Sequence, residues 1–137
     1  KEGLPAPGAV GMLCAAAAVE EMGDSLHYGF AIEGGEKIDI AKLPYYQGID
    51  RENPLFSPIK SDTMLARFPP TLLISSTRDF FLSSIVYTHS RLVKLGVEAD
   101  LHVWEGLRHG FFTDPDLEES RDAYQVIVNF FDKYLGV

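Results

Sequence analysis

The distribution of apolar and polar residues changes twice along the chain. Residues 9–15, AVGMLCA, are apolar without alternation, which is typical of a strand buried on both sides, although an alanine-rich helix has the same pattern. Residues 20–60 scatter Gly, Pro, Asp and Tyr among short apolar groups. We predict irregular structure there, with one or two short helical turns, and a long irregular segment of this kind is often functional.

From residue 64 the pattern is regular. Residues 64–68, MLARF, are predicted to form a short helix that ends at Pro69 and Pro70. Residues 71–75, TLLIS, form a continuous apolar run, as expected of a central parallel strand, and STRDFF then breaks that run.

A longer helix and a second strand follow. Residues 82–95 have helical periodicity, and Gly96 supplies a C-terminal stop. The apolar face of this helix is predicted to consist of Leu82, Ile85, Val86, Leu92 and Val93. Residues 97–103, VEADLHV, alternate apolar and polar positions, which predicts a strand with one wet face, near an edge of the sheet.

The C-terminal stretch is predicted to be a loop followed by a helix. We predict a loop over the stretch WEGLRHGFF. A helix is then predicted to begin with Asp114 as its N-cap and Pro115 in its first turn. The apolar stripe of this helix is predicted to consist of Tyr124, Ile127, Val128, Phe131 and Leu135. The order over 64–137 is the βαβα rhythm of an α/β protein with a right-handed crossover, and we treat residues 1–137 as a single α/β domain.

The composition and net charge of the chain restrict the classes of partner that it is expected to bind. The chain has 137 residues, 46% of them hydrophobic, which is the balance of a globular domain. Its formal net charge of −8 makes nucleic acid and anionic membrane surfaces unlikely partners. The longest apolar run, residues 9–19, is too short to cross a bilayer. The single cysteine, Cys14, is interpreted as a small buried apolar residue in a reducing compartment, which predicts a cytoplasmic protein.

In α/β proteins the reactive groups usually lie just past the carboxyl ends of the strands, and two residues of this chain are predicted to lie there. Asp79 follows the strand at 71–75, and His109 follows the strand at 97–103. Consecutive strands are usually neighbours, so the carboxylate can fix the tautomer of the imidazole and stabilise its protonated form. Each residue alone is more often a surface or capping group, and Asp79 could simply cap the next helix. Gly110 would allow a tight turn after the histidine.

The other potential ligands give no comparable pattern. His27, His89 and His102 lack such a context, and their spacing from Cys14 and from carboxylates does not match a zinc site. We therefore expect no metal and no other cofactor.

A longer stretch resembles a known family. The segment FPPTLLISSTRDFFLSSIVYTHSRLVKLGVEADLHVWEGLRHGFF strongly resembles the C-terminal part of the α/β-hydrolase superfamily, nearest to carboxylesterases of the hormone-sensitive-lipase-like family. NPLFSPIKS, residues 53–61, looks like the segment that precedes the acid-bearing strand in these proteins. The resemblance implies that Asp79 in TRDFFLS is the acid of a catalytic triad and that His109 in RHGF is its base.

Two expected motifs of that family are missing. The nucleophile of the family lies in a G-D-S-A-G-type elbow, and its oxyanion hole draws on an H-G-G-G motif. The chain contains neither, and it begins with Lys1 rather than Met. The sequence therefore looks like the C-terminal portion of such an esterase, without the N-terminal half.

Ser25, in the stretch GDSL, is the one alternative nucleophile. An elbow needs a glycine two residues after the serine, where this chain has His27, as well as a strand before it and a helix after it. Esterases named for a GDSL motif place it directly after a strand and carry their base in a D-x-x-H pattern, which is not the arrangement here. A G-D-S stretch also recurs in a loop of the hormone-sensitive-lipase-like family. We interpret Ser25 as a loop residue, next to an Asp24 that makes a local turn.

The resemblance implies hydrolysis of a short-chain carboxylic ester or lactone. His109 would deprotonate a serine and then protonate the leaving alkoxide, while Asp79 orients and stabilises it. Four aromatic residues flank the two loops and either line an apolar substrate pocket or pack in the core: Phe80, Phe81, Phe111 and Phe112.

The chain alone should be a poor catalyst, since the nucleophile and the oxyanion hole are absent. We expect self-association or pairing with the missing N-terminal half, through the sheet edge at 97–103 and apolar contacts from 9–15. A non-catalytic remnant or interaction module of the same fold is an alternative, and a self-sufficient esterase that uses Ser25 is a third.

Overall fold

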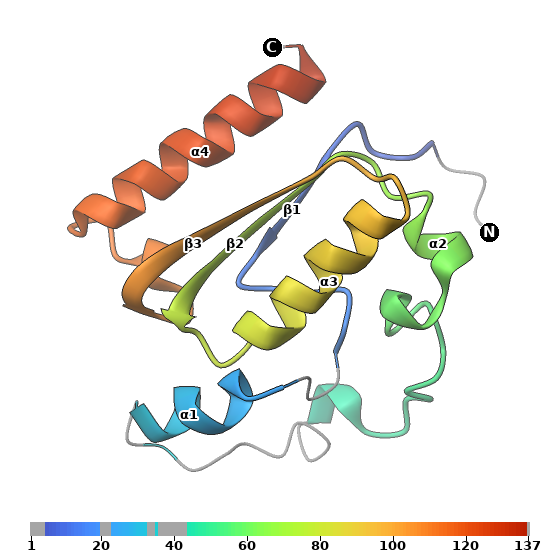
Figure 1. Ribbon diagram of the computed structural model, residues 1–137, viewed down its shortest axis with the longest axis horizontal. Coiled ribbons are helices and arrows are strands. Elements are labelled where there is room, and N and C mark those ends of the chain that lie inside the picture. Colours follow the sequence, from blue (N-terminus) through green and yellow to red (C-terminus); the bar gives the residue numbers. More distant parts are fainter. Residues whose placement is uncertain (1–4, 20–22, 33–34, 36–43, 137) are drawn as a thin grey trace.

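A parallel sheet lies between helices in the computed structural model of the chain (Figure 1). The structure describes residues 5–19, 23–32, 35 and 44–136. The helices and strands are β1 Val10–Leu13, α1 Ser25–Ile32, α2 Asp62–Leu65, β2 Thr71–Arg78, α3 Leu82–Lys94, β3 Ala99–Arg108 and α4 Glu118–Leu135. The α/β class predicted from the sequence is confirmed.

The described sheet has the order β1-β2-β3, with both pairs of strands parallel. Thr71 is in register with Val10 on one side and with Ala99 on the other. The central position predicted for the strand at 71–75 is confirmed. The strand continues to Arg78, however, because the polar residues after the apolar run still find partners. Ser76 Oγ, for example, donates a hydrogen bond to the carbonyl oxygen of Arg108 at 3.1 Å.

The two outer strands differ from their predictions in one respect each. The strand expected at 9–15 forms as β1, but it is only half-buried and Gly11 is exposed, because β1 lies at an edge of the described sheet. The edge position expected for 97–103 is confirmed in β3. This strand extends through Arg108, so most of the predicted loop WEGLRHGFF is strand. Trp104 within it packs against the core under α4.

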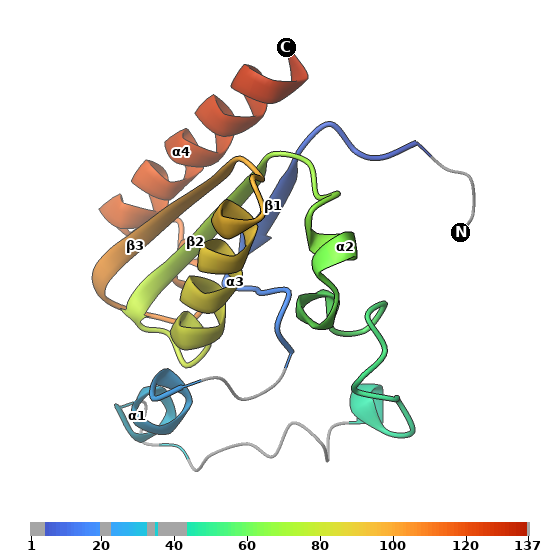
Figure 2. The same cartoon turned by 45° about the vertical axis from the view of Figure 1, so that its right-hand side comes forward.

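Alternate residues of β2 belong to two different hydrophobic layers, because successive side chains of a strand point to opposite faces of the sheet. Leu73 joins the layer under α3, whose buried members include Ile85 and Leu92. Leu72 and Ile74 join the layer under α4. Figure 2 shows α3 and α4 on opposite faces of the sheet. The core therefore fixes β2 between two helices and leaves the carboxyl ends of the strands free to carry a site.

The apolar face predicted for α3 is confirmed only in part. Ile85 and Leu92 are fully buried, but Val86 and Val93 are 42% and 51% exposed. The inward face is completed instead by polar Ser84 and Thr88. Each step along a helix rotates the side chain by about 100°, which turns Val86 and Val93 away from the sheet that Ile85 and Leu92 face.

The last helix begins later than predicted. Asp114 does not cap α4. Its Oδ1 accepts a hydrogen bond from the Asp116 backbone N–H at 3.0 Å, which closes a turn before the helix starts at Glu118. Of the predicted stripe, Ile127 and Phe131 pack into the core. Its other members are exposed in this chain, namely Tyr124, Val128 and Leu135.

The segment 20–60 is more ordered than predicted where the structure describes it. Two short 3-10 turns, Pro44–Tyr46 and Pro58–Lys60, match the expected helical turns. The eight-residue helix α1 is longer than the short helical turns that were predicted for this segment. The rest of the prediction, at 20–22, 33–34 and 36–43, lies outside the described residues. None of the helices in the described ranges is long and apolar enough to span a membrane.

Candidate active site

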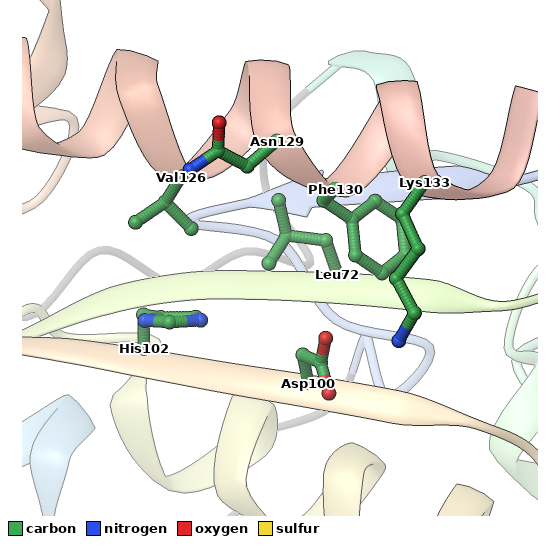
Figure 3. Close-up of a pocket in the computed structure, with 7 residues that line it drawn as sticks. All are labelled: Leu72, Asp100, His102, Val126, Asn129, Phe130 and Lys133. Atoms are coloured by element: carbon green, nitrogen blue, oxygen red, sulfur yellow. The ribbon is translucent and has the colours of Figure 1, made fainter. Parts of the chain in front are cut away.

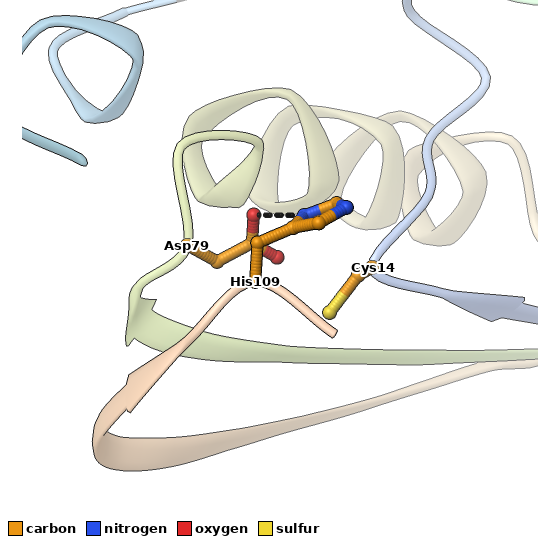
Figure 4. Close-up of side chains that lie close together, drawn as sticks. All are labelled: Cys14, Asp79 and His109. Atoms are coloured by element: carbon orange, nitrogen blue, oxygen red, sulfur yellow. Dashed lines mark hydrogen bonds and ion pairs between the residues drawn. The ribbon is translucent and has the colours of Figure 1, made fainter. Parts of the chain in front are cut away.

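The carboxyl ends of β2 and β3 bring Asp79 and His109 together. Arg78 and Arg108 are register partners at the ends of these two strands, so the residues that follow them lie side by side. His109 Nδ1 lies 2.7 Å from Asp79 Oδ1, which is a hydrogen bond (Figure 4). The proximity predicted from strand order is therefore confirmed.

Asp79 is fully buried, and each of its carboxylate oxygens is hydrogen-bonded. Oδ1 also accepts from the Phe81 backbone N–H at 2.8 Å, and Oδ2 accepts from Ser75 Oγ at 2.8 Å. Burial alone would raise the pKa of Asp79, but the hydrogen bonds from His109, Phe81 and Ser75 outweigh it and lower that pKa. The side chain is thus a carboxylate at neutral pH. Phe81 is itself the N-cap of α3 and no side chain caps this helix, so the bond from the Phe81 N–H closes a turn before the helix and the alternative that Asp79 simply caps α3 is wrong.

His109 is held in a defined orientation and is partly open to solvent. Because the ionised carboxylate can only accept, Nδ1 is the protonated nitrogen, and Nε2 is the one that can take a proton. The ring stacks on Phe80, with centroids 4.3 Å apart and an interplanar angle of 25°. The histidine side chain is 34% exposed, whereas Asp79 beneath it is at 0%. This is the arrangement of a general base oriented by a buried acid.

Cys14 is a third member of the site that sequence analysis missed. It is buried, as predicted, and its Sγ accepts a hydrogen bond from the Gly110 N–H at 3.2 Å. Burial, followed by the nearby charge of Asp79, raises the pKa of the thiol to about 12, so it stays protonated. Gly110 has φ 70°, which confirms the tight turn expected there. Cys14 directly follows β1, so the rule that selected Asp79 and His109 could have selected it as well.

These three side chains are also the group that could hold a metal within the described part of the chain. One potential ligand atom from each of Cys14, Asp79 and His109 lies within 4.8 Å of the others. A soft divalent cation bound to both Asp79 Oδ1 and His109 Nδ1 would have to break their hydrogen bond and displace the thiol proton. The contacts already present account for all three positions without an ion.

Ser25 contacts the loop that follows Asp79. It is the first residue of α1, so the prediction that it is a loop residue is wrong. Its side chain is nevertheless buried, and its Oγ donates to the carbonyl oxygen of Phe80 at 2.9 Å and accepts from the Ser83 N–H at 2.8 Å. The hydroxyl proton is directed to a backbone carbonyl and not to the imidazole of His109. This geometry is not that of an activated nucleophile.

The four phenylalanines divide into two pairs. Phe80 and Phe81 lie next to the imidazole, with ring centroids 4.3 Å and 6.1 Å from that of His109. Phe111 is 1% exposed and packs in the core under α4, together with Phe112. Phe80 and Phe81 are partly exposed beside the base, and Phe81 also packs against the core under α3.

The remaining histidines have other surroundings. His27 is exposed, and a nitrogen of His89 lies 3.1 Å from the carbonyl oxygen of Ala99. His102 lines a shallow cavity of about 200 Å³ between β3 and α4, shown in Figure 3. Asp100 and Lys133 lie in the same cavity, near the start of β3 and therefore at the far end of this strand from His109.

Comparisons with known proteins agree with the fold and identify the family. Residues 1–113 match the family described as alpha/beta hydrolase fold. An esterase of Fusarium pseudograminearum is 40% identical over 80 residues, which are 57% of this chain and 25% of that esterase. A crystal structure of an esterase superposes with a TM-score of 0.79 and 35% identity, covering 93% of this chain and 40% of the other.

A second solved structure shows which subgroup of this family the chain is similar to. An esterase from the bacterial hormone-sensitive lipase family superposes with a TM-score of 0.82 and 28% identity, covering 96% of this chain and 45% of that one. The chain thus spans less than half the length of these two structures. The chain belongs to the alpha/beta hydrolase fold family and is similar to its hormone-sensitive-lipase-like esterases.

Proposed function

We propose that this chain supplies the acid and the base of a serine hydrolase that cleaves short-chain carboxylic esters or lactones. The observation that carries the proposal is the 2.7 Å hydrogen bond between a buried carboxylate, Asp79, and the partly exposed imidazole of His109. In this mechanism His109 Nε2 removes the proton of an attacking serine and later delivers it to the leaving alkoxide. Asp79 keeps the proton on Nδ1 and stabilises the imidazolium that forms.

The nucleophilic serine and the oxyanion donors must then come from another polypeptide segment. The chain covers 40% and 45% of the two solved esterases, which supports this division. Ser25 is a poor substitute because both functions of its hydroxyl are already used. The chain alone would therefore lack the interactions that contribute most to acyl transfer. In this proposal it is the C-terminal portion of a complete cytoplasmic enzyme.

Two sheet edges are available for association. β3 lies at one edge of the described sheet and β1 at the other, so they offer separate surfaces. We propose that the edge of β3 pairs with a second copy of the chain and that the half-buried β1 contacts the complementary half of the domain. Both modes would cover unpaired strand edges.

The test is fluorophosphonate labelling read by intact mass, because this reagent reacts only with activated serines. It is applied to the 137-residue chain and to the product of the complete reading frame that contains it. We expect no labelling of the chain and stoichiometric labelling of the complete product, together with hydrolysis of p-nitrophenyl butyrate. Both should be lost in His109→Gln.

Two other outcomes would overturn the proposal. Labelling of the 137-residue chain that disappears in Ser25→Ala would make Ser25 the nucleophile. A folded complete product without labelling or hydrolysis would indicate a non-catalytic member of the fold.

A further inference from the structure

The GDSL stretch that is not used as a nucleophile makes a specific contact with the acid-bearing loop. Ser25 forms three hydrogen bonds to this loop. Its Oγ donates to Phe80 O and accepts from Ser83 N–H, and its own N–H donates to Ser83 Oγ at 3.2 Å. A serine at a helix start normally accepts from the backbone of its own helix. Here the partners are 55 and 58 residues away, so the serine connects two elements instead of capping one.

Two glycines of the same stretch allow this close approach. A Cβ on Gly29 would lie 2.7 Å from Phe80 Cα, a distance that real Cβ atoms do not reach. A Cβ on Gly23 would lie 2.8 Å from Ser83 Cβ, and the φ of Gly23 is +82°, where a side chain is strained. Gly29 is a poor helix former in the middle of α1. Its presence is explained by the contact with the loop rather than by helix stability.

A stack of rings continues from this contact to the base. Phe30 of α1 stacks on Phe80, with centroids 4.5 Å apart and an interplanar angle of 16°. Phe80 in turn stacks on His109 at 4.3 Å. The ring of Phe80 therefore touches α1 and the imidazole, while its backbone carbonyl is held by Ser25. Asp79 precedes Phe80 directly, so acid and base are both connected to α1 through one residue.

We propose that Ser25 is a positioning residue that seats α1 on the loop 79–83 and thereby holds Phe80 against His109. The contact keeps the imidazole plane aligned so that Nδ1 stays on Asp79. The catalytic consequence of this role rests on the proposed function. The positioning itself does not, because it is a property of the folded chain.

The experiment is NMR of the 137-residue chain with ¹⁵N-labelled histidine, in which the His109 signals are identified by their loss in His109→Gln. Two quantities are read: the rate at which the Nδ1 proton exchanges with water, and the upfield ring-current shift of the imidazole protons. In Ser25→Ala we expect exchange about tenfold faster, as lost hydrogen bonds of ordinary strength imply, and a smaller ring-current shift.

A matched control and a rescue variant separate positioning from general loosening. Ser57 is also fully buried, but its hydroxyl has no hydrogen-bond partner among the described residues. Ser57→Ala should leave both His109 signals unchanged. Ser25→Thr keeps the hydroxyl and should restore the slow exchange. In the complete reading-frame product, Ser25→Ala should lower kcat with little change in KM.

Unchanged exchange and ring-current shift in a folded Ser25→Ala would overturn the positioning role. If that variant does not fold, as judged by circular dichroism, Phe30→Leu decides, since it keeps the bonds of Ser25 and removes one ring of the stack. His109 signals like those of the wild type in Phe30→Leu would then overturn the proposal. A chain without any esterase partner would still show these effects, so the failure of the enzymatic proposal would be distinguished from the failure of this one.

Discussion

Replacing Asp79 by asparagine tests whether the buried carboxylate is an ionised acceptor. Its oxygens accept three hydrogen bonds, from His109, Phe81 and Ser75. Bonds to a charged group contribute about 1.5–3 kcal/mol and neutral ones about 0.5–1.5 kcal/mol, so loss of the charge weakens the three by about 3 kcal/mol together. An asparagine also has one oxygen where the carboxylate has two, but it avoids the cost of a buried charge. We expect a net loss of about 2–3 kcal/mol at neutral pH.

The difference should depend on pH with a definite sign. The folded-state pKa of Asp79 lies below its ordinary value of 3.8. Its contribution to stability is therefore present above the unfolded pKa and is lost as the pH falls through the folded pKa. Asp79→Asn lacks this contribution, so the free energies of unfolding of the two proteins should converge as the pH falls through the folded pKa of Asp79.

The assay is urea unfolding followed by the fluorescence of Trp104, the single tryptophan. The control is Asp114→Asn, because an amide oxygen can still accept from the Asp116 N–H and stability should not change. Equal stability of wild type and Asp79→Asn at neutral pH, or a difference that persists in acid, would refute the reasoning. Equal stability would mean that desolvation of the carboxylate offsets its hydrogen bonds, and a persistent difference would mean that the charge of Asp79 is not its cause.

Three further predictions concern the surroundings of the site and the core. Cys14 should react with a disulfide reagent at pH 8 only on unfolding, because the pKa of its buried thiol is raised to about 12; rapid reaction of the native chain would contradict this. Gly110→Ala should cost about 1–2 kcal/mol in urea unfolding, since its φ is 70° and a side chain is strained there. Leu92→Ala should cost about 2–5 kcal/mol, and exposed Val93→Ala less than about 0.5 kcal/mol; similar losses would place both on one buried face.

The pairing of Asp79 with His109 could be predicted because it depends on strand order alone. Parallel neighbours end at the same edge of a sheet, whatever packs around them. The same rule applied to the first strand would have brought in Cys14. A cysteine in an apolar run is, however, equally well explained as a small buried residue, so its place after a strand does not by itself indicate a site.

The faces of the helices could be predicted only in part. Periodicity shows which residues are apolar, but the neighbouring sheet decides which of them it covers. Thr88 is buried because its hydroxyl accepts a hydrogen bond from the Ala17 N–H at 3.2 Å, and Val93 is left in solvent. The start of α4 was misplaced for a similar reason, since Asp114 forms a turn with Asp116 instead of a cap.

Helix α1 could not be predicted from local propensity. It is only eight residues long and has a glycine in its interior, so it would be marginal as an isolated helix. What stabilises it is contact with a loop 55 residues later in the chain, through Ser25 and the close approach at Gly29. The sequence argues against a nucleophile at Ser25, because His27 replaces the glycine of an elbow, but only the tertiary partner shows that the serine connects α1 to this loop.

The contacts that orient the acid and the base all come from residues of this chain. Asp79 is fixed by Ser75, Phe81 and His109, and the turn after His109 is fixed by Cys14. None of these contacts needs a nucleophile in place. In the enzyme proposed above, the Asp–His pair would therefore be organised before the serine-bearing segment docks, and docking would complete the site without rearranging the pair. Preorganisation of this kind is what makes a base effective, because no reorientation is required when the proton moves.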